Sequence, residues 1–333
     1  MNNDWEFDHV GMVVRSLAEI SAYYPSLGIG VDIGPLGNGA VWPVPGSPEE
    51  ERRPTTMTVF GKPFVDRPHS PTPSGVMVNN FIQNLQVGSL VVEGIMAHPG
   101  DDGMNDVFFR GYGDGISHIC FNVPDPEKET AALVKKGCGI VMSLEQDGRI
   151  VENYLDTGKC GHIWLSFRPL PDKRHRDWQA HNRAHPLVSD WQFRGMGVVV
   201  RDLDKAVAYY RHLGIAVIQP EIMLDSSSSR SFKVHGLTGS VVKARARTVL
   251  IGTIAYEFIQ PLEKETTLGE YLSRRPEGAC SLDFTVKDLA RETARLTYRG
   301  VHLLFSGKLK DGSVFAYFDT CKVGNLLVKL VQA

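Results

Sequence analysis

Two histidines at the starts of repeated sequence segments are the residues best suited to do chemistry in this chain. The segment FDHVGMVVRSLAEISAYYPSLGI recurs as FRGMGVVVRDLDKAVAYYRHLGI, but His9 of the first copy is Gly195 in the second. Further along, DGISHICFNVPD recurs as EGACSLDFTVKD, where Ser281 stands in the place of His118. Neutral imidazole is a common ligand of transition metals. The pattern therefore predicts a metal site in the first copy and a shared scaffold in the second.

The repeat also predicts how the chain is divided. The first copy covers residues 1–168 and the second covers 191–333, with a polar, proline-bounded linker at 169–190. A stretch rich in Pro and Gly at 35–74 is predicted to be a loop insertion in the first copy. We therefore expect two domains of similar architecture.

Each copy contains the same order of predicted elements twice. In the first half of copy one, a β-branched strand at 10–14 precedes a segment with helical spacing at 17–24, which ends near a glycine. In its second half, a strand at 118–123 and a helix at 126–136 are followed by three apolar stretches, at 140–144, 149–155 and 162–167. The order is β-α-β-β-β, and four such modules fill the chain.

Composition excludes several classes of protein. The 333 residues carry a formal net charge of -2, so the chain has no broad attraction for nucleic acid or an anionic membrane. No secretory signal precedes the first strand, and no apolar run is long enough to span a bilayer. The five cysteines show no CxxC spacing, which disfavours a disulfide framework. We expect a cytoplasmic protein.

These segments resemble the vicinal oxygen chelate superfamily, which includes glyoxalase I, methylmalonyl-CoA epimerase, extradiol dioxygenases and fosfomycin-resistance proteins. HVGMVVRSL, GMGVVVRDLDKAVAYYRHLGI, GISHICFNVPD and YFDTCKVGNLLVKLVQ carry the resemblance, which covers most of both copies. It implies an α+β fold of tandem domains, in which four βαβββ modules form two cup-shaped curled sheets. The concave face of each sheet, here called the cup, holds a divalent metal in many members.

The resemblance also implies four ligand positions in the glyoxalase and epimerase branches. His9 and His118 occupy two of them, and Glu93 in SLVVEGIMAHPG occupies the third. The fourth, normally a glutamate on the last strand, falls on Leu165 or Ser166. Two imidazoles and one carboxylate suit Fe, Co, Ni, Mn or Zn, and three protein ligands leave positions open for water or substrate.

Other residues carry weaker signals. Lys243, Arg245 and Arg247 alternate along one strand, so one face of that strand presents three cations that would bind a carboxylate, a phosphate or a CoA tail. A solvated sheet face is the alternative meaning. Tyr154 has a counterpart in Tyr317, which favours a shared packing role.

Three functions remain open at this stage. The favoured one is a metal-dependent isomerase, epimerase or lyase, which acts on a small carbonyl substrate through an enediolate-type intermediate, with its base unidentified. The second is an Fe(II)-dependent ring-cleaving dioxygenase of the extradiol type. The third is a non-catalytic small-molecule binding or resistance protein. The expected partner is a small molecule, and the expected assembly is a monomer or a homodimer.

Overall fold

The computed structural model describes two compact units. One, the N-terminal unit, comprises residues 4–157 and 163–189; the other, the C-terminal unit, comprises residues 158–162 and the chain from Asp190 onward. The described residues are 4–34, 55–65, 69–71, 77–79, 81–100, 102–226, 232–235, 242–309 and 312–332. Much of the insertion predicted at 35–74 therefore lies outside the described residues.

The N-terminal unit contains two βαβββ modules. The first consists of β1 (Glu6–Val14), α1 (Leu17–Ser26), β2 (Gly30–Gly34), β7 (Ile82–Val87) and β8 (Leu90–Met96). The second consists of β9 (Gly115–Val123), α3 (Pro126–Val134), β10 (Ile140–Gln146), β11 (Arg149–Leu155) and β12 (Trp164–Pro169). Both helices begin at a side-chain cap, because Ser16 accepts a hydrogen bond from the third residue after it and Asp125 does the same.

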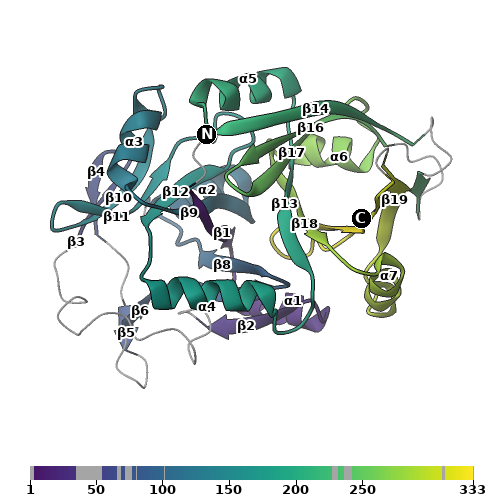
Figure 1. Cartoon of the computed structure of the whole chain (residues 1–333), viewed down its shortest axis with the longest axis horizontal. Coiled ribbons are helices and arrows are strands. Elements are labelled where there is room, and N and C mark those ends of the chain that lie inside the picture. Colours follow the sequence, from purple (N-terminus) through teal and green to yellow (C-terminus); the bar gives the residue numbers. More distant parts are fainter. Residues whose placement is uncertain are drawn as a thin grey trace. The chain divides into compact units, whose positions relative to one another are not determined.

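The ten strands of the main sheet run in the order β2-β7-β8-β1-β9-β12-β11-β10-β3-β4. The two modules meet where β1 pairs antiparallel with β9, and each of these strands has a parallel neighbour on its other side, β8 and β12. Figure 1 shows β1, β8, β9 and β12 side by side in this unit. The first strand of each module and the last strand of each module are thus four consecutive strands within the sheet.

Part of the predicted insertion is strand. β3 (Thr55–Val59) and β4 (Lys62–Phe64) extend the sheet beyond β10, and β5 (His69–Pro71) pairs with β6 (Met77–Asn79) in a separate small sheet. The sequence TTMTV of β3 is rich in β-branched residues, which suit a strand. A stretch expected to be a loop therefore also builds one edge of the curled sheet.

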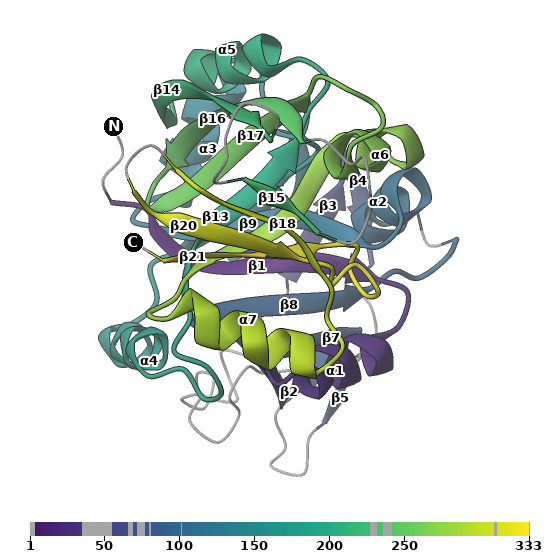
Figure 2. The ribbon, with the colours of Figure 1, turned by 90° about the vertical axis from the view of Figure 1, so that its right-hand side faces the viewer.

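The C-terminal unit repeats this plan. Its first module has β13 (Gln192–Val199), α5 (Leu203–Leu213), β14 (Ala216–Asp225), β15 (Lys233–Val234), β16 (Lys243–Ile251) and β17 (Ile254–Pro261). Its second has β18 (Gly278–Thr285), α7 (Leu289–Tyr298), β19 (Leu303–Lys308), β20 (Val314–Phe318) and β21 (Leu327–Gln332). The strand order is β14-β16-β17-β13-β18-β21-β20-β19-β15, and Figure 2 shows β13, β18, β20 and β21 in this sheet. The predicted fold class, tandem α+β domains of four βαβββ modules, is confirmed.

Three further helices lie outside the modules: α2 (Met104–Tyr112), α4 (Lys173–Ala184) and α6 (Thr267–Arg274). α2 packs into the apolar core of the N-terminal unit, where Phe108 meets the ring of Trp164 edge-on. α4 forms within the segment predicted as a linker, and its Arg183 donates a hydrogen bond to the backbone of β1. No helix in the described residues has the length and apolar character needed to cross a bilayer.

Candidate metal centre

The predicted ligands lie on three adjacent strands of the N-terminal unit. His9 is on β1, Glu93 on β8 and His118 on β9. Gly11 pairs with Glu93 across the parallel ladder and with His118 across the antiparallel one. A Cβ atom at Gly11 would lie 1.7 Å from Cε1 of His118, so glycine is what leaves room for this imidazole. The fold therefore brings all three predicted residues together at the point where the two modules meet.

The three side chains form a small buried triangle of donor atoms. Nε2 of His9 lies 3.3 Å from Nε2 of His118 and 3.4 Å from Oε2 of Glu93, and Nε2 of His118 lies 3.8 Å from the same oxygen. Metal bonds of about 2.0–2.2 Å place neighbouring ligand atoms about 3–3.6 Å apart in tetrahedral or octahedral geometry. Two of the three separations fall in this range and the third, between His118 and Glu93, is 3.8 Å, so with a small side-chain adjustment the triangle fits one divalent ion with further coordination positions open.

Each imidazole is oriented by a second contact on its other nitrogen. Nδ1 of His9 lies 3.2 Å from Oδ2 of Asp8, and Nδ1 of His118 lies 3.1 Å from Oγ of Ser117. Asp8 in turn accepts a hydrogen bond from Gln179 of α4. Such contacts on the outer nitrogen keep the other nitrogen of a metal-binding histidine directed at the metal.

Burial and the neighbouring charges shift the pKa values of the three side chains in different directions. Burial lowers the pKa of His9, but the charge of Glu93 and the hydrogen bonds of His9 to Asp8 and Glu93 outweigh it and raise this pKa to about 9. Burial raises the pKa of Glu93, yet His9 and Arg168 lower it to about 2. Burial and the charge of His9 hold the pKa of His118 well below its ordinary value. Without a metal, His9 is thus the cationic partner of Glu93, and a divalent ion at this site would have to replace the proton on His9.

Ser166, and not Leu165, lies on the cup face at the fourth ligand position. Ser166 pairs with Tyr154 on β11, and the hydroxyl of Tyr154 lies 3.3 Å from Nε2 of His118. The Oγ of Ser166 donates a hydrogen bond of 3.3 Å to Oε1 of Glu152, which is also on β11. The last strand supplies a hydroxyl at this position, and the neighbouring strand supplies a carboxylate next to it.

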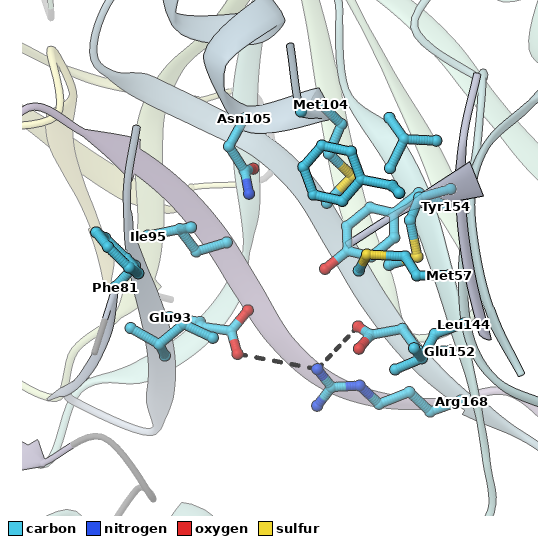
Figure 3. A pocket seen from close by; sticks show the side chains of 15 residues that line it. Met57, Phe81, Glu93, Ile95, Met104, Asn105, Leu144, Glu152, Tyr154 and Arg168 are labelled. Carbon is cyan, nitrogen blue, oxygen red and sulfur yellow. Dashed lines mark ion pairs between the residues drawn. The ribbon is translucent and has the colours of Figure 1, made fainter. Parts of the chain in front are cut away.

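A cavity of about 220 Å³ lies beside Glu93. At one end Arg168 lies between two carboxylates, with Nη2 2.8 Å from Oε1 of Glu152 and 3.8 Å from Oε1 of Glu93, as Figure 3 shows. The remaining wall is mostly apolar and is formed by Met57, Val59, Phe64, Phe81, Ile82, Ile95, Gly103, Met104, Asn105, Met142, Leu144 and Tyr154. This cavity suits a small molecule with an apolar body and a polar end.

Glu152 and Arg168 were not predicted to be site residues, and Tyr154 was predicted to have a packing role. Tyr154 is buried, and its hydroxyl also contacts His118. Strand alternation could have found all three, because Arg168 is two residues beyond Ser166 and Glu152 is two before Tyr154. Their approach to each other depends on how β11 and β12 pair, which the local sequence does not show.

The three predicted substrate-binding cations are all paired with carboxylates. The ion pairs join Lys243 to Glu263, Arg245 to Asp204 and Glu221, and Arg247 to Glu221. All belong to the C-terminal unit, whereas the cavity beside Glu93 is lined by residues of the N-terminal unit. Their role in substrate binding stays a prediction.

The chain is similar to known proteins mainly at the level of fold. Residues 195–318 match the model of the glyoxalase/bleomycin resistance protein/dioxygenase superfamily. A mutant of 4-hydroxymandelate synthase from Streptomyces coelicolor shares the fold over 99% of this chain and 92% of its own, with a TM-score of 0.61 and 12% identity. A xylose isomerase-like TIM barrel/4-hydroxyphenylpyruvate dioxygenase fusion protein matches 98% of this chain, which spans 49% of that protein, with a TM-score of 0.52 and 14% identity.

Other comparisons add little. Methylmalonyl-CoA epimerase from Mycobacterium tuberculosis matches 42% of this chain and 86% of its own at 21% identity, but the TM-score of 0.33 is too low to support an argument. No curated protein is significantly similar to the chain in sequence. At these identities the solved structures show the architecture and leave the reaction open. By sequence, residues 195–318 of the second copy match the glyoxalase/bleomycin resistance protein/dioxygenase superfamily, and by fold nearly the whole chain has the architecture of tandem vicinal oxygen chelate domains.

Proposed function

We propose that the N-terminal unit contains the active site of a metal-dependent isomerase, epimerase or lyase that acts on a small carbonyl compound. The observation that supports it is the buried triangle of His9, Glu93 and His118 beside a cavity that contains a further carboxylate, Glu152. A divalent ion bound by the triangle would act as a Lewis acid on the oxygens of a carbonyl substrate and favour its enediolate form.

Glu152 is the residue proposed to remove the proton next to the carbonyl. It lines the cavity, and its carboxylate is held between the hydroxyl of Ser166 and the guanidinium of Arg168. A carboxylate with fixed orientation serves as a general base when a substrate C–H bond is placed against it. Arg168 also lies close to Glu93, so it is placed to hold a negatively charged substrate oxygen as charge develops.

The cavity wall limits the size and polarity of the substrate. Met57 and Leu144 lie beside Tyr154 on one side of the cavity, and Phe81 and Ile95 lie on the other, as Figure 3 shows. A volume of about 220 Å³ accommodates a compact molecule, and apolar walls exclude water from its body. Aromatic or branched aliphatic 2-oxo acids and hydroxy ketones fit this description.

Proton exchange in heavy water tests the proposal even when the product is unidentified. Protein loaded with Co, Ni, Mn, Zn or Fe ions is incubated anaerobically in D₂O with such compounds, and NMR follows loss of the C–H signal next to the carbonyl. Glu152→Gln should slow exchange by at least about 100-fold with metal content unchanged. The exposed Glu19→Gln is the control and should exchange like the unmodified protein. Absence of exchange with every metal and compound would rule out this reaction class for the compounds tested.

A ring-cleaving Fe(II) dioxygenase is the second candidate. The triangle contains two histidines and one carboxylate, and this ligand set is typical of non-haem iron oxygenases. Ser166 at the fourth position adds no further carboxylate ligand. An oxygen electrode separates the two candidates. Consumption of oxygen with a catechol substrate, only after ferrous loading and not after His9→Ala, would establish the dioxygenase and exclude the isomerase.

A further inference from the structure

The C-terminal unit keeps the geometry of the metal centre but fills it with different residues. Gly197 on β13 pairs with Glu257 on β17 and with Ser281 on β18, which is the same pairing that Gly11 makes in the N-terminal unit. By this register Glu257 holds the position of Glu93. The carboxylate position is therefore retained, while both histidine positions are lost.

The last strand supplies the key difference. Ser166 on β12 pairs with Cys120, two residues after His118, and Lys329 on β21 pairs with Asp283, two residues after the serine that replaces that histidine. Lys329 thus holds the position of Ser166. Where the N-terminal unit has a neutral hydroxyl, the C-terminal unit has an amine.

The side chain of Lys329 extends to the position that corresponds to the ligand triangle of the N-terminal unit. Its Nζ forms an ion pair with Oε2 of Glu257, lies 3.3 Å from Oδ2 of Asp283, and lies 5.3 Å from the ring centre of Tyr317. Asp283 also accepts a 2.6 Å hydrogen bond from Ser281. Lys329 and Asp283 are buried, with exposed fractions of 7% and 4%. One cation therefore lies between two carboxylates inside the cup.

The charge state of Lys329 is set by these neighbours. Burial lowers its pKa, but the charges of Glu257 and Asp283 outweigh burial and raise it, so the side chain is an ammonium ion. Removing one partner of a buried ion pair leaves an uncompensated charge, which is strongly unfavourable. Burial raises the pKa of Asp283, so without Lys329 the two carboxylates would either take up a proton or bind another cation.

We propose that the ammonium group of Lys329 is the resident cation of the second cup, that it excludes divalent metal ions there, and that removing it exposes a metal site built from Glu257 and Asp283. The inference uses the proposed metal centre of the N-terminal unit only as a template. Carboxylate oxygens without imidazole favour hard ions such as Mn²⁺ over softer ones. The chain as it exists would then bind one metal ion, in the N-terminal unit.

Mn²⁺ binding in a background that lacks the first site tests the proposal. His9→Ala and His118→Ala together remove the N-terminal ligands, and Lys329→Gln or Lys329→Glu is then added. The control is Lys287→Gln, which removes an exposed lysine of the same unit. Electron paramagnetic resonance of free Mn²⁺ measures binding, and circular dichroism follows folding with and without Mn²⁺.

Each Lys329 variant should bind one Mn²⁺ ion at least about tenfold more tightly than the background and the Lys287→Gln control, or should require Mn²⁺ to fold. Binding of one ion by the background would show that Lys329 does not exclude metals, and would overturn the proposal. Lys329 variants that bind no Mn²⁺, whether folded or not rescued by the ion, would also overturn it. Failure of the unmodified protein to bind any metal would refute the proposed function alone, because the Lys329 comparison does not use the first site.

Discussion

Asp8 and His9 are consecutive residues of β1, and yet Oδ2 of Asp8 lies 3.2 Å from Nδ1 of His9. Consecutive strand residues normally point to opposite faces of a sheet. The register between β1 and β9 shifts between Phe7 and Val10, and this irregularity spans both residues. A local bulge of this kind redirects side chains, and here it lets a carboxylate orient the imidazole next to it.

Asp8→Asn should weaken metal binding. The amide keeps the shape of Asp8 but lacks the charge that holds the proton on Nδ1 of His9, and loss of such an outer contact typically costs about 10–100-fold in affinity. Titration against a chromophoric chelator measures the change. The control is Asp4→Asn, which changes an exposed residue near the start of the same strand. Equal metal affinity of the Asp8→Asn and Asp4→Asn variants would show that Asp8 does not orient His9.

Metal affinity should rise with pH. His9 has a pKa of about 9 in the metal-free protein, and its proton must leave before Nε2 binds an ion. Below pH 9 each added pH unit should therefore strengthen binding by about tenfold, with about one proton released per ion. Calorimetry in two buffers of different ionisation enthalpy counts that proton. A flat affinity between pH 6 and 8 would contradict the assignment of the proton to His9.

Gly11→Ala should abolish metal binding and destabilise the N-terminal unit. Its new Cβ would overlap the ring of His118, and overpacking of this kind typically costs about 1–3 kcal/mol. Gly111→Ala in α2 is the matched control, because no atom lies within 4 Å of its added Cβ. Thermal unfolding and metal titration check both variants. Unchanged metal binding in Gly11→Ala would contradict this prediction, because β1 and β9 would then have to move apart easily to accommodate the new Cβ.

Tyr154→Phe should tighten metal binding by a factor of about 2–10. The hydroxyl of Tyr154 lies 3.3 Å from Nε2 of His118, where it competes with a metal for the same lone pair, and a neutral hydrogen bond is worth about 1 kcal/mol. The counterpart change Tyr317→Phe lies in the other unit and should leave this affinity unchanged. Weaker binding in Tyr154→Phe would show that the hydroxyl supports the bound ion.

The sequence was sufficient to predict the repeated modules and to select His9, Glu93 and His118, which the fold brings together; that they bind a metal stays a prediction. Their signals are local: strand and helix periodicity, and histidines lost between two otherwise similar copies. Glu93 was implied by the family resemblance, which places a ligand on the strand before the second module. Periodicity depends on residues close together in the chain, and the lost histidines appear when the two copies are aligned, so both can be predicted without a structure.

Other parts of the site depend on pairing between distant segments. The choice between Leu165 and Ser166 required the register of β12 against β9, and the contact of Glu152 with Arg168 required that of β11 against β12. The bulge at Asp8 breaks the alternation on which strand predictions rely. Part of the predicted loop insertion is strand because β3 finds a partner in β10, more than 70 residues later.

Lys329 is made with the chain, whereas a metal ion must be obtained from the surroundings. The C-terminal unit therefore carries the counter-charge for its buried carboxylates from the moment of synthesis. In cells starved of transition metals, this unit would mature normally while the N-terminal unit retained a proton on His9. Folding of the C-terminal unit would therefore not depend on the metal supply, whereas loading of the N-terminal unit would.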